Sequence, residues 1–304
     1  MAETKSTFNF FYSKLLSGKV REKSEVIIIS IAIISFIIHL LLIALTNLDI
    51  LRLNDYSKIF QNPIAAIYTP FSFILIYEVY LLVYYLPKST TIYIGKQYEI
   101  ITLIVIRGIF NDLAHLEFTV NWFTVKNDLK FTGDLVATLL LFFLIFMFYR
   151  INERKDCDQE KNDSLSPKML RFIKFKNIIA MCLIPVFLIL GVYGLNRWIQ
   201  GNFFSISQLV YSMKDVNTIF FNDFFTVLIL TDVLLLLISF LYTDKFSKVI
   251  RNSGFIISTI LIKMSFGAEG LLQTILIVVA VGFGLLILLI HNQHEKLELA
   301  EGKV

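Results

Sequence analysis

The segment FSFILIYEV, residues 71–79, carries a carboxylate, Glu78, near the middle of a long apolar run. A second segment, FTVLILTDV at 225–233, aligns with it without a gap and places Asp232 opposite Glu78. Each lies in an apolar run of the length, roughly 17–25 residues, that crosses about 30 Å of hydrocarbon. Both acids are therefore predicted to lie inside transmembrane helices.

Composition supports this interpretation for the whole chain. Of the 304 residues, 56% are hydrophobic and 17% are charged, against about 45–50% and about 25% in ordinary soluble domains. The fold class is therefore predicted to be an all-α integral membrane protein with about eight transmembrane helices. The apolar runs place these helices at 25–47, 64–87, 97–114, 134–150, 176–198, 219–243, 252–267 and 270–291. The third and seventh are shorter and more polar than the others.

The distribution of basic residues predicts the orientation. With both termini in the cytoplasm and eight crossings, twenty of the 28 lysines and arginines fall on the cytoplasmic side and six outside. Such an excess is the positive-inside pattern of membrane proteins. The net charge of +4 thus comes from membrane-flanking loops and does not indicate a nucleic-acid partner. Frequent Ile, Phe, Lys and Asn suit an AT-rich bacterial coding bias, so we expect a bacterial inner membrane.

The longest cytoplasmic loop divides the chain into two sets of four helices. We expect a basic N-terminal segment, a first membrane repeat, a charged linker, a second repeat and a cytoplasmic tail, at 1–24, 25–150, 151–175, 176–291 and 292–304. A second match supports the repeat, because IVIRGIF (104–110) aligns with ILIKMSF (260–266). An even number of helices gives two tandem repeats in one orientation, related by an axis along the membrane normal.

The repeat also offers a reason for the two acids. The second match places Arg107 opposite Lys263. Counted from the inner ends of the apolar runs at about 1.5 Å per residue, all four charged residues lie roughly 14–16 Å deep. An unpaired charge there costs about 2.5–3.5 kcal/mol on insertion scales. We therefore predict two intramembrane ion pairs, Glu78–Arg107 and Asp232–Lys263. Such pairs either mark an ion path or only fix the register of the helical hairpins.

Other candidate residues follow from their positions. His39, Asp112 and His115 could extend a relay outward from Glu78, although a lone histidine on an apolar helix is more often a packed residue. The basic residues Arg171, Lys174 and Lys176 end the linker and are expected to contact anionic lipid or a cytoplasmic partner. No zinc-protease pair, nucleophile elbow, P-loop or paired-cysteine motif is present. We therefore expect no enzymatic activity, no cofactor and no metal site.

Two functions remain compatible with these features. The first is a channel or transporter for an ion or small solute that uses the paired charges. The alternative is a non-transporting membrane subunit or scaffold that recruits a cytoplasmic partner or anionic lipid through its basic linker. The partners expected are the bilayer, the transported species and, for the scaffold, the cytoplasmic protein.

The topology can be tested by thiol labelling in intact cells. Cysteines introduced at Lys126 and Lys214 are expected to react with an impermeant reagent, because both positions lie in outer segments. Cys157, in the cytoplasmic linker, is expected to stay unlabelled until the cells are opened. Labelling of Cys157 in intact cells would contradict eight crossings with the N-terminus inside.

Overall fold

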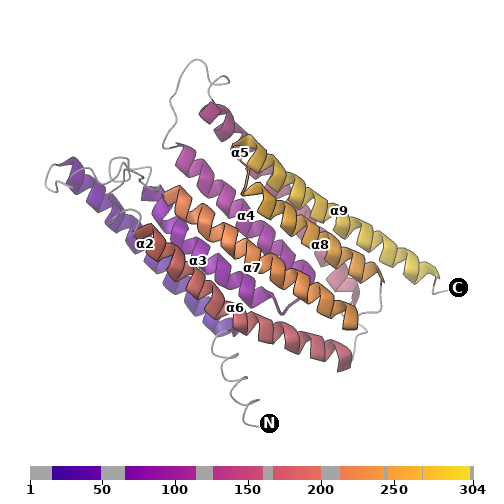
Figure 1. Cartoon of the computed structure of the whole chain (residues 1–304). Coiled ribbons are helices and arrows are strands. Elements are labelled where there is room, and N and C mark those ends of the chain that lie inside the picture. Colours follow the sequence, from indigo (N-terminus) through magenta and orange to yellow (C-terminus); the bar gives the residue numbers. More distant parts are fainter. Residues whose placement is uncertain are drawn as a thin grey trace, which may run out of the picture. The chain divides into compact units, whose positions relative to one another are not determined.

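A computed structural model describes residues 16–48, 66–113, 126–159, 167–199, 213–242, 246–268 and 270–301 of the chain. This part is helical and contains no strand (Figure 1), which confirms the all-α fold class. Each helix overlaps one of the predicted ranges. The helices are α2 (Gly18–Asn47), α3 (Tyr68–Tyr85), α4 (Thr90–Leu113), α5 (Lys126–Gln159), α6 (Pro167–Ile199), α7 (Met213–Tyr242), α8 (Phe246–Ser265) and α9 (Leu271–Glu301).

Five of these helices are long and apolar enough to cross a membrane. Their spans are Gly18–Asn47, Asp128–Asn152, Leu170–Tyr193, Asp223–Tyr242 and Leu271–Leu297. α3 holds a shorter apolar stretch, Thr69–Tyr85. α4 and α8, the third and seventh helices in order, are not among the five, because each carries several charged side chains. The chain is therefore a multi-pass membrane protein.

The exposed side chains also indicate a bilayer. On α2, Ile27, Ile34 and Leu41 are each more than half exposed, at 57%, 57% and 56%. Leaving a large aliphatic side chain in water forgoes roughly 1.5–3 kcal/mol of burial free energy. Contiguous apolar surface of this kind marks contact with a membrane or another protein. This apolar surface runs along α2, a helix of 30 residues, which is long enough to cross the hydrocarbon layer of a membrane.

Local chemistry explains several helix ends. The Ser17 hydroxyl accepts a hydrogen bond from the backbone N–H of Val20 at 3.3 Å and caps α2. Pro167 begins α6, where its missing N–H costs nothing. Before α9, Gly270 has a φ of 64°, which favours glycine because it has no Cβ. The expected linker 151–175 is helical at both ends, since α5 continues to Gln159 and α6 begins at Pro167.

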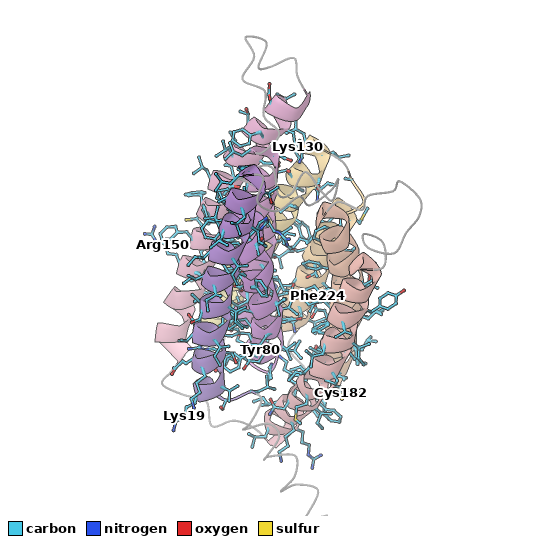
Figure 2. All side chains as sticks on the ribbon, turned by 90° about the vertical axis from the view of Figure 1, so that its left-hand side faces the viewer. Lys19, Tyr80, Lys130, Arg150, Cys182 and Phe224 are labelled. Carbon is cyan, nitrogen blue, oxygen red and sulfur yellow. The ribbon has the colours of Figure 1, made fainter. Side chains whose placement is uncertain are left out.

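The chain divides into two compact units. Unit 1 comprises residues 1–84 and 96–142, and unit 2 comprises 85–95 and 143–304, so α4 and α5 each contribute to both. In unit 1 a hydrogen bond of 2.6 Å between His39 Nδ1 and the Thr69 hydroxyl joins α2 to α3. The rings of Phe71 and Phe110, 5.2 Å apart, join α3 to α4. Figure 2 shows Lys19 and Lys130 at opposite ends of the helices of this unit.

In unit 2 the helices α6, α7, α8 and α9 pack in chain order (Figure 1). Phe187 and Phe224, with ring centroids 4.7 Å apart, join α6 to α7. The Ser258 hydroxyl donates to the Ala280 carbonyl at 2.7 Å and joins α8 to α9. α8 and α9 come so close that a Cβ built on Gly254 would lie 2.7 Å from the Ile287 side chain.

This close approach gives a test of the packing. Gly254→Ala is expected to lower the free energy of unfolding in detergent by about 1–3 kcal/mol, because overpacking forces neighbouring atoms to move. Gly282→Ala on α9 is the matched control, since nothing lies within 4 Å of its Cβ position. There the change is expected to stabilise by up to about 1 kcal/mol. Adding Ile287→Ala to Gly254→Ala should restore part of the loss, and equal effects of the two alanines would contradict the α8–α9 contact.

Candidate functional site

The predicted Glu78–Arg107 ion pair is not among the ion pairs of the described residues. The reason is the position at which α4 begins. Thr90 starts this helix, seven residues before the expected Gln97. Glu78 is therefore about 10 Å from the C-terminal end of α3 at Tyr85, whereas Arg107 is about 25 Å along α4. The two charged residues lie at different depths.

The groups around Glu78 belong instead to the N-terminal halves of α2 and α4. Its carboxylate interacts electrostatically with Glu99, Lys96 and Glu25. Lys96 forms an ion pair with Glu99 at 2.6 Å, and the Tyr77 hydroxyl donates to Glu25 at 3.0 Å. The Oε2 atom of Glu78 is buried and has no hydrogen-bond partner within the described part of the chain. Unit 1 thus gathers three carboxylates around one lysine.

The proposed relay residues have separate contacts. His39 is 8% exposed and bonds Thr69 as described above, which is the contact of a packed histidine. Asp112 accepts a hydrogen bond from Lys130 at 2.5 Å. Lys130 also lies 3.9 Å from Asp134, one turn further along α5. His115 lies outside the described residues. Lys130 and Asp134 were not singled out from the sequence, although their spacing of four residues is that of helical ion pairs.

The same register difference separates Asp232 from Lys263. α8 begins at Phe246, six residues before the expected Asn252. Asp232 is about 15 Å from the C-terminal end of α7 at Tyr242, and Lys263 is about 25 Å along α8. No ion pair joins them among the residues that the structure describes. Asp232 is 6% exposed and is buried beside a different cation, Lys176 of α6.

Asp232 and Lys176 line one cavity in unit 2, which we call the Lys176 cavity. Its volume is about 30 Å³. The wall is formed by the start of α4 and the loop before it, with α6, α7 and α8. The lining residues are Leu86, Thr90, Tyr93, Ile94, Phe172, Lys176, Asp232, Leu235, Leu236, Asn252, Phe255 and Ile256. Most of this surface is apolar, so the few polar groups are conspicuous.

Lys176 is held by backbone and ring contacts. Its Nζ donates a hydrogen bond to the Lys88 carbonyl at 3.0 Å. Lys88 lies in the loop between α3 and α4, so this hydrogen bond joins α6 to that loop. The Phe172 ring centroid lies 5.1 Å from the same Nζ, a cation–π distance. No direct ion pair joins Lys176 to Asp232 within the described residues, so the two charges interact across the cavity.

This burial corrects the expectation that Lys176 contacts lipid or a partner with Arg171 and Lys174. Lys176 is 6% exposed, whereas Arg171 and Lys174 are exposed. Helical geometry explains the difference. Successive residues turn by about 100°, so Lys176 is about 200° from Lys174, while Arg171 is only about 60° from Lys174. The spacing of Lys174 and Lys176 in the sequence therefore already indicated that their side chains lie on opposite faces of one helix.

A second polar cluster lies at the N-terminal end of α8 and the C-terminal part of α9. The Nδ1 of His291 is 3.1 Å from the Ser247 carbonyl, which can only accept, so Nδ1 carries the proton. Its Nε2 then accepts from Arg251 Nη1 at 3.3 Å and lies 3.8 Å from Glu295. Arg251 also donates to the Asn252 side chain at 3.3 and 3.2 Å, and Asn252 lines the Lys176 cavity.

Comparison of this chain with protein-family models, with curated proteins and with solved structures finds no match.

A double-mutant cycle tests the register of unit 1. Glu78→Leu and Arg107→Leu are expected to change the free energy of unfolding additively, within about 0.5 kcal/mol, because their side chains do not meet. The matched pair Asp112→Asn and Lys130→Gln is expected to couple by about 1 kcal/mol. Both cycles can be measured by unfolding in mixed micelles. If Arg107→Leu restored the stability that Glu78→Leu removes, the two side chains would form the ion pair predicted from the sequence. That result would contradict the helix register described here.

Proposed function

We propose that this protein moves an ion across a membrane, expected to be the bacterial inner membrane. The observation that supports this best is the Lys176 cavity, whose lining includes two opposite charges from helices that are long enough to span a membrane. A charged side chain at the centre of a membrane helix costs about 2.5–3.5 kcal/mol, and such residues usually mark ion paths or proton relays. A purely structural pair would gain most by direct contact. Lys176 and Asp232 instead both line a cavity without a direct ion pair, which favours a functional role.

The scaffold alternative has an observation of its own. Arg171 and Lys174 are exposed on the face of α6 opposite to Lys176. Each base near an anionic membrane surface contributes about 1 kcal/mol of attraction. The pair therefore suits anionic headgroups or an acidic partner. It does not account for Lys176 and Asp232, which are buried, so we place ion movement first.

Reconstitution into liposomes tests the proposal. The full-length protein is expected to carry ion flux above that of empty liposomes, and Asp232→Asn should reduce this flux about tenfold or more, because the amide keeps the size but removes the charge. Asp223→Asn is the control, since it makes the same change on the same helix at an exposed position.

Two outcomes would contradict the proposal or part of it. Equal ion flux through the Asp232→Asn and Asp223→Asn variants would show that the Lys176 cavity takes no part in transport. A tight membrane with every ion tested would contradict ion movement altogether. In that case the scaffold predicts that replacing Arg171 and Lys174 with glutamine weakens binding to anionic vesicles, by about fivefold for each base.

A further inference from the structure

The hydrogen-bond donors of Lys176 are not fully used by the protein. An ammonium group has three N–H donors. One is taken by the Lys88 carbonyl at 3.0 Å, and the described residues offer no other hydrogen-bond acceptor to Nζ. Lys176 is 6% exposed and lies within an apolar span, so lipid supplies no acceptor either. The remaining N–H groups therefore require a partner inside the Lys176 cavity.

The size of the cavity limits that partner. A water molecule needs about 10–15 Å³ of cavity measured with a water-sized probe. The volume of about 30 Å³ therefore holds one or two waters. Sites for small organic molecules have volumes of about 300–1,000 Å³. An organic solute is too large for this site, which leaves water or a small inorganic ion.

The charges at the wall then decide between water and an inorganic ion. A metal cation needs about six or more oxygen ligands, whereas the polar lining side chains besides Lys176 are Thr90, Tyr93, Asp232 and Asn252. A metal cation would also be repelled by the Lys176 ammonium. An inorganic anion would be repelled by the Asp232 carboxylate. A water molecule avoids both conflicts, because it accepts from an ammonium and donates to a carboxylate.

We propose that the Lys176 cavity holds water between Lys176 and Asp232 and passes protons along it, so that the transported ion is the proton. This inference rests on the proposed function and names its substrate. In the step, an N–H bond of the Lys176 ammonium breaks and its proton bonds to the water oxygen. The same water gives another of its protons to a carboxylate oxygen of Asp232. The products are a neutral amine, an unchanged water and a carboxylic acid.

The low dielectric of the membrane interior makes this exchange accessible. Each ion buried there carries a desolvation penalty of several kcal/mol. Moving one proton from Lys176 to Asp232 removes both charges and both penalties, at the expense of their mutual attraction. The charged and neutral forms of the pair are therefore closer in free energy than they would be in water. A relay needs two such forms of similar stability.

Ion selectivity in liposomes tests the inference. Proton flux is measured with an enclosed pH dye, and potassium, sodium and chloride fluxes are measured in parallel preparations. We expect proton flux at least tenfold above that of empty liposomes and no excess flux of the other ions. Lys176→Met, which removes the exchangeable protons while keeping a long side chain, and Asp232→Asn should each abolish the proton flux. Asp223→Asn should leave it unchanged.

The outcomes separate this inference from the proposed function. Flux of potassium, sodium or chloride that depends on Asp232, without proton flux, would overturn the proton assignment and leave ion movement standing. No flux of any ion would overturn both. Infrared difference spectra of the wild-type protein after a pH step provide a measurement that does not need folded variants at Lys176. A carboxylic-acid C=O band that shifts in D₂O and is missing from Asp232→Asn is expected, and its absence in the wild type would overturn proton uptake by Asp232.

Discussion

The hydrocarbon core of a membrane offers no hydrogen-bond partner, so each polar group within it must be satisfied by the protein. Several hydroxyl groups meet this constraint on their own helix, as when Thr231 donates to the Val227 carbonyl at 2.8 Å. Others bond a neighbouring helix, as Ser258 does with Ala280. Lys176 reaches the carbonyl of Lys88, 88 positions away along the chain. The polar residues thus fix which helices are neighbours and at what register.

The sequence predicted the helices well, because apolar runs of membrane length are a strong signal. It placed their ends less well. The stretches 90–96, TTIYIGK, and 246–251, FSKVIR, are too polar to count as apolar runs, yet they are helical. Helical backbone hydrogen bonding does not require apolar side chains, so the helices continue through such residues. Depths counted from the apolar runs were consequently about 10 Å too short for Arg107 and Lys263. Both predicted ion pairs were based on these shorter depths.

The contacts of the candidate site were predictable only in part. The opposite faces of Lys174 and Lys176 follow from helical rotation, so the burial of Lys176 was within reach. Its acceptor was not, because a backbone carbonyl has no sequence signature and lies on a distant segment. The cavity beside Asp232 depends on the way in which α4, α6, α7 and α8 pack together. Packing of that kind follows from the shapes of many side chains, which a pattern in one chain does not specify.

Glu78 and Asp232, which align in the two matching segments, differ in their surroundings. The helix that follows contributes to these surroundings in both cases, α4 for Glu78 and α8 for Asp232. In unit 1 that helix brings charges, Lys96 and Glu99, close to the acid. In unit 2 it brings Asn252, Phe255 and Ile256, and the lysine comes from α6 instead. Each acid thus has a lysine nearby, although different helices supply it. A buried carboxylate requires a nearby cation, but it does not specify which helix provides it. This freedom lets unit 2 leave space for water where unit 1 gathers additional charges.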